Sequence, residues 1–278
     1  MKKQKEIIFI LIFFLFCITL TYSERVISLS PSITEILFEL GKGNQIVGNT
    51  RFCNHPPGSL PIKKVGGFLD INVEMIIDLK PDRIFHYPEH LNKIKKLGQF
   101  AKLVMIPHKS IRDLLNSIEI ISGELSINKK GLELTKKIRN QIEKVRKKVK
   151  RKVKRKVLII IGRDPNRLRN ITIIGKGDFL NEIIGIAGGI NSYDGNISYP
   201  SVSIESIIKM DPDLIIEFSF SPDPPSKESI ISLWSKFPYI RAVKKKNIHV
   251  ISDDYWVRPG PRIGRIAESM YEMLHKYR

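Results

Sequence analysis

The chain has 278 residues, 42% of them apolar, which is enough to bury one large core or two medium ones and excludes a generally disordered protein. Its formal net charge of +19 would suggest nucleic-acid binding if it were spread over one face, but the segment Lys136–Lys156 alone holds thirteen Lys or Arg against one Glu. No aromatic residue interrupts that segment to stack on bases, so the composition argues against a nucleic-acid partner.

The first element along the chain has the layout of an export signal. Three lysines within residues 2–5 precede an apolar run over residues 7–16, and Thr21 and Ser23 are the small residues at the −3 and −1 positions of a cut after Ser23. The run is shorter than the roughly 20 residues that a spanning helix needs. We therefore expect residues 1–23 to be a cleaved signal peptide and the mature protein to be periplasmic or otherwise extracytoplasmic.

The two cysteines restrict the chemistry further. Cys17 offers a lipid anchor as the alternative to simple cleavage, although the bulky Phe16 precedes it where lipid-attachment sites have a small residue. After cleavage only Cys53 remains, and one cysteine forms neither an internal disulfide nor a thiolate metal cluster. A Cys–His nucleophile with His55 is disfavoured because Pro56-Pro57 follows directly and no third orienting group is evident.

The first half of the mature chain has the pattern of a β–α–β unit. A short β-branched run over 26–29 predicts a buried parallel strand, and Ser32-Ile33-Thr34-Glu35 predicts a capping box that starts a helix ending near Gly41. Asn72 is placed to cap a second helix, and Pro81-Asp82 leads from it into the next strand.

A long helix is predicted in the middle of the chain, from about Asn128 to Arg155 with Ser126 as its cap. Its apolar residues recur at steps of three and four on one narrow stripe: Leu134, Ile138, Ile142, Val145, Val149 and Val153. The rest of this helix is strongly basic. We interpret that surface as a solvated face, and contact with anionic lipid or a cell-surface polymer is the alternative.

The second half repeats the first 131 residues later. The matching segments are 25–27 with 156–158, 73–77 with 204–208, and 81–84 with 212–215. A further match of 35–41 with 182–188 has an offset of 147, and a polar insertion near 164–176, expected to be a loop or hairpin, absorbs the difference. Two halves with the same order of elements predict two similar lobes.

The predicted fold class is therefore α/β, with two Rossmann-like lobes joined by a single long backbone helix. The expected boundaries are an N-terminal lobe over 24–126, the connecting helix over 127–155 and a C-terminal lobe over 156–278. Ligand-binding loops are expected at the carboxyl ends of the strands.

The motifs of the commonest α/β enzymes are absent from the sequence: it has no Walker loop, no strand-coupled Gly-x-Gly-x-x-Gly, no Gly-x-Ser-x-Gly and no His-Glu-x-x-His. His86 and His90 have the spacing of two metal ligands on a helix, but Pro88 between them disfavours a regular helix, so no metal site is expected. A secreted α/β hydrolase or metal-dependent enzyme stays a remote alternative, and a structural or adhesive surface protein is a third.

Five loops combine aromatic residues with turn residues and predict a shared cleft. They contain Phe52, Gly66–Phe68, Tyr87-Pro88, Tyr199-Pro200 and Asp254–Arg262. Aromatic rings supply a large and stiff contact area, and arginines supply forked donors for amides or carboxylates. Loops that face only solvent need neither.

Several of these motifs together resemble the periplasmic vitamin B12-binding proteins of ABC importers. They belong to the helical-backbone class of solute-binding proteins, class III, which also carries ferric siderophores and haem. The motifs are the segment Arg25–Pro31, the pair Pro56-Pro57, Val65-Gly66-Gly67-Phe68, Tyr199–Ser203 and the segment Asp254–Arg262. The resemblance spans nearly the whole mature chain, and it implies a corrinoid held between the two lobes.

The resemblance also implies the binding residues. Six positions match the family's ligand contacts: Phe52, Phe68, Tyr87, Tyr199, Asp254 and Arg258. Trp256 and Arg262 lie in the last motif and are further candidates. The chain has Phe68 and Tyr199 where the B12 carrier has tryptophans, which changes the width of the cleft and keeps a ferric siderophore or haem open as the alternative ligand.

For partners, the resemblance implies an ABC permease with its cytoplasmic ATPase. Glu74 and Glu205 match the two glutamates at the lobe tips that dock on permease arginines in this family, although a carboxylate at a helix start is also favoured by the helix dipole. The protein is expected to be a monomer and not an enzyme, with no cofactor beyond its transported ligand.

Overall fold

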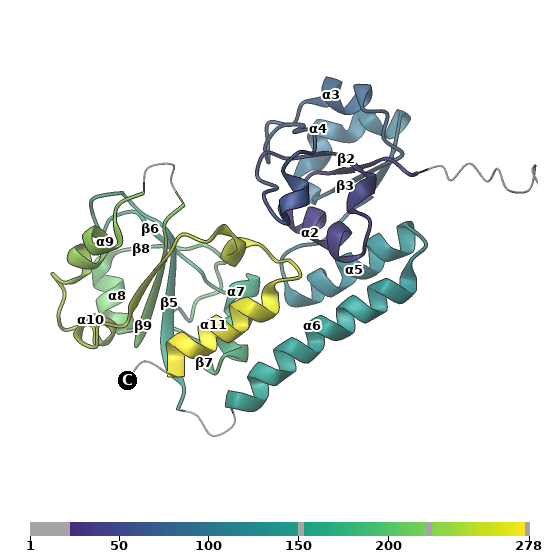
Figure 1. Cartoon of the computed structure of the whole chain (residues 1–278). Coiled ribbons are helices and arrows are strands. Elements are labelled where there is room, and N and C mark those ends of the chain that lie inside the picture. The colour runs from purple at the N-terminus through teal and green to yellow at the C-terminus, as the bar shows by residue number, and fades with distance from the viewer. Residues whose placement is uncertain (1–22, 150–152, 221–223, 276–278) are drawn as a thin grey trace, which may run out of the picture.

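The computed structural model describes residues 23–149, 153–220 and 224–275, which form two α/β lobes joined along one side (Figure 1). The expected signal peptide, apart from Ser23, and the possible lipid-anchor residue Cys17 lie outside these residues. Within the described part of the chain, none of the helices is both long and apolar enough to cross a membrane.

The N-terminal lobe is built on a parallel sheet of four strands in the order β2-β1-β3-β4. The strands are β1 (Val26–Ser28), β2 (Ile46–Asn49), β3 (Arg83–His86) and β4 (Lys102–Met105). The helices are α2 (Pro31–Glu39), α3 (Val73–Asp78), α4 (Leu91–Ile94) and α5 (Ile111–Glu124). The 3-10 turns are Gly43–Gln45, Pro57–Ser59, Pro88–His90 and Lys95–Gln99.

The C-terminal lobe has a mixed sheet of six strands in the order β10-β9-β5-β6-β8, with β7 also paired to β5. The strands are β5 (Arg155–Gly162), β6 (Ile171–Ile173), β7 (Gly189–Asn191), β8 (Ser201–Val202), β9 (Leu214–Phe218) and β10 (Ile248–Ile251). The helices are α7 (Phe179–Ile186), α8 (Ile204–Met210), α9 (Lys227–Trp234), α10 (Arg241–Lys244) and α11 (Ile263–His275), with a 3-10 turn at Asp254–Val257. The predicted insertion contributes the antiparallel hairpin β5–β6.

The two lobes repeat each other down to the strand register, and the predicted α/β class is confirmed. Strands β1 and β3 are parallel with Val26 facing Arg83, and β5 and β9 are parallel with Val157 facing Leu214. Both pairs coincide under the shift of 131 residues that the sequence predicts.

The Pro-Asp turn of each half has the same structural task. Asp82 accepts a hydrogen bond on Oδ2 from the backbone N–H of Arg25 at 2.7 Å, and Asp213 accepts one from that of Lys156 at 2.9 Å. In each lobe the carboxylate therefore ties the start of the first strand to the start of its parallel neighbour. This bond explains why the Pro-Asp pair recurs at the same offset.

The helix before each Pro-Asp turn also has matching ends. Asn72 caps α3 as predicted, and Ser203 caps α8 in the same way, because each side-chain oxygen accepts from the backbone N–H of the third helical residue, at 2.9 and 3.3 Å. Lys80 and Asp211 then turn the chain with positive φ angles of 44° and 46°.

The predicted capping box of α2 is wrong. The helix begins at Pro31, whose fixed φ suits the first helical position, and Ser30 caps it without a side-chain hydrogen bond. Ser32 and Glu35 lie inside the helix and are buried. Glu35 is therefore available for another partner.

The connecting helix is shorter than predicted. Helix α6 covers Asn128–Val149 and does not reach Arg155. Arg155, which the periodicity assigned to the helix, pairs with Gly189 of β7 instead and belongs to the sheet of the C-terminal lobe. Val153 is 80% exposed and is not part of the buried stripe.

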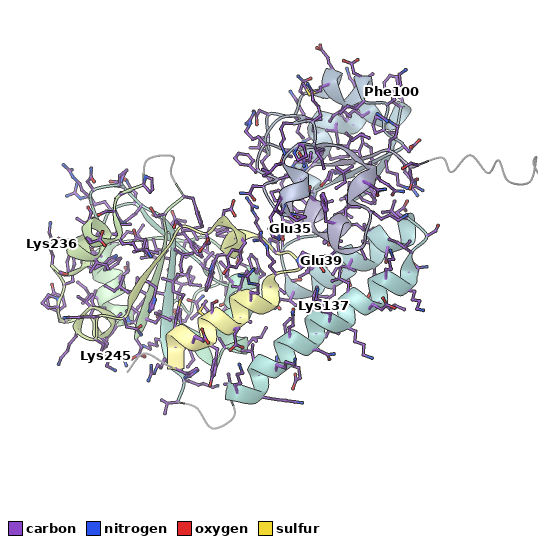
Figure 2. All side chains as sticks on the ribbon, in the orientation of Figure 1. Glu35, Glu39, Phe100, Lys137, Lys236 and Lys245 are labelled. Carbon is purple, nitrogen blue, oxygen red and sulfur yellow. The ribbon has the colours of Figure 1, made fainter. Side chains whose placement is uncertain are left out.

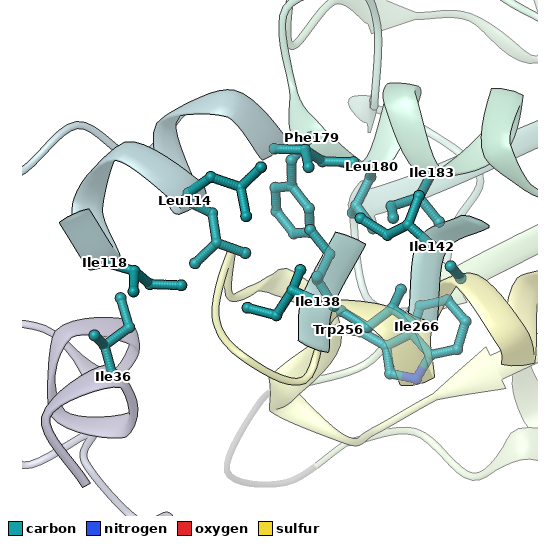
Figure 3. Close-up of a cluster of buried hydrophobic side chains, with 14 of the residues drawn as sticks. Ile36, Leu114, Ile118, Ile138, Ile142, Phe179, Leu180, Ile183, Trp256 and Ile266 are labelled. Atoms are coloured by element: carbon teal, nitrogen blue, oxygen red, sulfur yellow. The ribbon is translucent and has the colours of Figure 1, made fainter. Parts of the chain in front are cut away.

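One apolar core runs through the helices at the base of both lobes (Figure 3). The stripe of α6 packs there between α5 and α11, and α7 of the C-terminal lobe packs on the same cluster. The residues labelled in Figure 3 are Ile36, Leu114, Ile118, Ile138, Ile142, Phe179, Leu180, Ile183, Trp256 and Ile266. Because this core is continuous, the lobes are joined by packing as well as by the chain.

Candidate functional site

The carboxyl ends of the strands in both lobes lead into loops that meet between the lobes. Loops after β2, β3 and β4 come from the N-terminal lobe, and the segment after β10 comes from the C-terminal lobe. These loops form three parts of the candidate site: a polar bridge, an aromatic stack and a pocket.

Asp254 and Arg258, both among the predicted ligand contacts, form a polar bridge between the lobes. Arg258 pairs with Asp254 and also donates to Asn54 Oδ1 at 2.8 Å and to the carbonyl oxygen of Phe52 at 3.0 Å. Asn54 in turn donates to Asp254 Oδ2 at 2.8 Å. Burial lowers the pKa of Arg258, but Asp254 beside it opposes that effect, so the guanidinium stays charged.

Arg262 is held by a second contact across the lobes, which gives Glu35 its partner. The guanidinium donates to both carboxylate oxygens of Glu35, at 2.8 and 2.6 Å, and it also lies 4.8 Å from the ring centre of Tyr255. The Glu35 side chain is only 3% exposed and that of Arg262 is 17% exposed. Arg262 therefore fixes the segment against the N-terminal lobe, with its Nε and Nη2 donors used in this pair.

We expect the Glu35→Ala variant to lose about 3–5 kcal/mol of unfolding free energy, because it strands a largely buried guanidinium without its carboxylate. Glu39, on the same helix, is the matched control, since its pair with Lys137 is exposed (Figure 2). Its replacement by Ala should cost about 0–1 kcal/mol. Urea denaturation measures both losses, and equal losses in the two variants would contradict the structural role given to Glu35.

A stack of aromatic rings and imidazoles follows β3 and β4. The ring of Tyr87 lies 3.9 Å from that of His108 at an interplanar angle of 10°, and 5.8 Å from that of His90. Phe68 packs edge-on against His90 at 4.7 Å. Tyr87 is only 5% exposed, and burial raises the pKa of its phenol. Tyr87 therefore packs against the ring of His108 and holds it in place. We assign Tyr87 this supporting role instead of the predicted contact with a ligand.

Tyr199 forms the facing wall from the C-terminal lobe. Its side chain is 55% exposed, and its hydroxyl donates to Asp178 Oδ2 at 2.7 Å. Asp178 also caps α7 by accepting from the backbone N–H of Leu180 at 2.7 Å. Burial and the bond to Asp178 raise the pKa of Tyr199, while burial raises the pKa of Asp178. The ring is anchored at its hydroxyl and keeps its face free.

Between these walls lies a pocket of about 320 Å³. The N-terminal lobe lines it with Glu89, His108 and Lys109. The C-terminal lobe lines it with Gly177, Asp178, Phe179, Ser198, Tyr199, Val257 and Pro259. The pocket is therefore an opening with an aromatic wall, surrounded by one carboxylate of each lobe, an imidazole and a lysine. This arrangement suits a flat ligand with polar edges.

Three of the predicted contacts differ in their surroundings. Phe52 is 48% exposed at the polar bridge, and Phe68 is partly buried against the core. Trp256 is 2% exposed and packs in the core of Figure 3, so we withdraw it from the set of contacts. Its place in a 3-10 turn sends the indole inward while Val257 faces the pocket.

The two predicted docking glutamates occupy equivalent exposed positions. Glu74 is the second residue of α3 and Glu205 is the second residue of α8. Figure 1 shows these helices on different lobes and apart from α6. Neither glutamate lines the pocket between the lobes.

Asn54, His108 and Asp178 are site residues that sequence reasoning missed. His108 follows the fourth strand, so its position at a carboxyl strand end was a usable signal. Asp178 was recognisable as a helix cap but not as the partner of Tyr199, and Asn54 stands two residues after Phe52. Their meeting depends on tertiary structure.

The Cys53 thiol does not face the pocket. It is 1% exposed, and its Sγ accepts a hydrogen bond from Thr34 Oγ1 at 3.2 Å. No group of three or more His, Cys, Asp or Glu side chains that could hold a metal ion occurs in the residues that the structure covers.

Comparisons with known proteins agree with this architecture. A family model described as periplasmic binding protein matches residues 26–255. The chain is 29% identical over 253 residues to a vitamin B12-binding protein of Vibrio vulnificus (strain YJ016), covering 90% of this chain and 89% of that protein. It is 28% identical over 263 residues to YvrC of Bacillus subtilis (strain 168), an uncharacterized ABC transporter substrate-binding lipoprotein, covering 89% and 80% respectively.

A solved structure with the same fold carries a different description. It is a possible iron-binding (periplasmic solute-binding) protein from Staphylococcus epidermidis ATCC 12228, which superposes with a TM-score of 0.78 at 30% identity. The match covers 91% of this chain and 98% of that one. The similar proteins are thus binding proteins whose names point to more than one ligand.

Proposed function

The chain belongs to the periplasmic binding protein family, and on that premise we propose that it captures a corrinoid between its lobes for an ABC importer. The observation that carries this function is the pocket between the lobes. Tyr199 forms one wall, His108 on top of Tyr87 forms the other, and both walls face the same space. We propose that the ligand is released from this pocket chemically unchanged, so that the protein acts as a carrier.

The chemistry of the pocket suits a large ring with polar substituents. The free face of Tyr199 offers stacking area to a conjugated macrocycle. Outside the lining of this pocket, the polar bridge holds a carboxylate, a guanidinium and an amide, groups that can pair with the amide side chains of a corrin: Asp254, Arg258 and Asn54. The similarity to a vitamin B12-binding protein over 90% of the chain supports the same ligand class.

An iron ligand, as haem or a ferric siderophore, is the second candidate, favoured by the similarity to a possible iron-binding protein. Haem iron can be held by a histidine or by a tyrosine phenolate. The phenols here oppose ionisation, because Tyr199 donates to Asp178 and Tyr87 is buried, and both pKa values are raised. The similarity to a vitamin B12-binding protein over 90% of the chain makes the corrinoid the first candidate.

The proposed role in an importer implies partners and a location for this protein. We propose that the mature chain works outside the cytoplasm as a monomer, after export directed by residues 1–23 or with a lipid anchor at Cys17. The similarity to an ABC transporter substrate-binding lipoprotein supports this location. Glu74 and Glu205, one at an exposed helix start on each lobe, would dock on basic residues of the permease.

The absorption spectrum of the protein purified from its own host tests the ligand class. Corrin, haem and ferric catecholate absorb at visibly different wavelengths, so the ligand that is retained identifies itself. A corrin spectrum is expected. A Soret band would identify haem and a ferric catecholate band would identify a siderophore. Either result would contradict the corrinoid function and favour the iron ligand.

A further inference from the structure

His108 is the imidazole of the pocket between the lobes, and its ring nitrogens lack a hydrogen bond to any residue in the described ranges. Its Nδ1 is buried without a hydrogen-bond partner. Its Nε2 lies 3.6 Å from Glu89 Oε1, which is longer than a hydrogen bond. Both side chains line the pocket, opposite Asp178 and Tyr199. With Nδ1 buried, Nε2 is the nitrogen that a ligand can reach.

The ring of His108 is also held in a fixed orientation. It stacks on Tyr87 at 3.9 Å with nearly parallel planes, and Tyr87 is itself buried. Burial lowers the pKa of His108 although Glu89 partly opposes this, so the imidazole is neutral near pH 7 and keeps a lone pair. Neutral imidazole is the commonest protein ligand for metals.

The other metal-binding groups around the pocket are less available. Tyr199 donates to Asp178, and Asp178 also accepts from the backbone N–H of Leu180. His90 has an unpaired Nε2, but the residue is only 1% exposed beneath the stack. A corrin ring already supplies four equatorial nitrogens, so a single protein side chain can fill one of the two axial positions of its metal.

Building on the corrinoid function, we propose that His108 is an axial ligand for the cobalt of corrinoids that arrive with an exchangeable axial position. With the ring proton on Nδ1, the lone pair of Nε2 forms the bond to Co(III), and the coordinated water leaves with its own electron pair. No electron is transferred and no proton is released. The pocket would therefore select corrinoids that lack a strong axial ligand on the face toward the N-terminal lobe.

The variant His108→Phe separates coordination from stacking, because phenylalanine keeps a ring against Tyr87 and lacks the nitrogen. The probe is diaquocobinamide, whose axial waters both exchange. With the wild-type protein we expect its absorption bands to shift to those of an imidazole complex, and with His108→Phe we expect no shift and binding weaker by about tenfold or more. His55→Ala, in a different pocket beside Glu35, is the matched control and should behave as wild type.

Cyanocobalamin distinguishes this inference from the function on which it rests. Its axial positions are filled by cyanide and by its own base, so its absorption bands should not shift to those of an imidazole complex with either protein. Unshifted diaquocobinamide bands in the wild type, with equal affinity in His108→Phe, would overturn axial coordination while cyanocobalamin binding upheld the corrinoid function. A wild type that binds neither corrinoid would overturn both.

Discussion

Reversing Glu74 and Glu205 to Lys in one chain is expected to abolish uptake in cells and to leave corrinoid binding unchanged. Both residues are exposed at the second position of a capped helix, one on each lobe. The hydroxyl of Ser203 lowers the pKa of Glu205, which keeps that carboxylate charged. At a basic surface of the permease, each reversal turns attraction into like-charge repulsion. The pocket between the lobes contains neither residue.

Glu228 provides the control for this pair of reversals. It is also an exposed second residue of a capped helix, α9, so Glu228→Lys disturbs the same helix dipole at another site. Uptake of labelled cobalamin should stay near wild type in Glu228→Lys and fall to background in the double reversal. Normal transport by the double reversal, or its failure to fold in a thermal melt, would reject the docking role.

The second large effect is expected from Tyr199→Ala, which should weaken corrinoid binding about 30-fold or more, as for an aromatic hot spot of 2 kcal/mol or above. The ring of Tyr199 is the exposed aromatic wall of the C-terminal lobe, and no other aromatic side chain of that lobe except Phe179 lines this pocket within the described chain. Tyr199→Phe keeps the stacking face and loses only the bond to Asp178, so it should stay close to wild type.

Tyr239→Ala is the matched control for Tyr199→Ala. Tyr239 is 63% exposed on the same lobe and packs edge-on with Phe237, outside the pocket. Isothermal titration with cyanocobalamin should give wild-type affinity for this control. Equal affinities for Tyr199→Ala and Tyr239→Ala would remove Tyr199 from the binding site.

The repeat could be read from the sequence because local chemistry specifies it. The Pro-Asp turns make the same backbone contacts through Asp82 and Asp213, and Asn72 and Ser203 cap equivalent helices. Features of this kind need only a few neighbouring residues. For that reason they appear as fixed spacings in a single chain.

The end of α6 was not predictable in the same way. The periodicity continues to Val153, but Arg155 joins β5 because strand β7, more than thirty residues later, pairs with it. The start of α2 failed for a related reason, since Glu35 serves Arg262 of the other lobe instead of its own helix end. Long-range partners override local patterns in both places.

The candidate binding site also combines features that local motifs predict with contacts that depend on long-range partners. Motif matches predicted Tyr199, Asp254 and Arg258 as ligand contacts, and they did not reveal that Asn54 bonds to the last two or that Asp178 accepts from the first. From sequence alone, an aromatic residue in a loop can be either a ligand contact or a core residue. For this reason Trp256 was expected at the ligand, whereas in the structure it lies in the core.

Isothermal titration of the mature, ligand-free wild-type chain with cyanocobalamin tests the central claim most directly. The corrinoid function predicts one site per molecule with sub-micromolar affinity, which corresponds to about −8 kcal/mol or better. Absence of heat and of any thermal shift with cyanocobalamin and other corrinoids, together with saturable binding of haemin or a ferric siderophore, would contradict it.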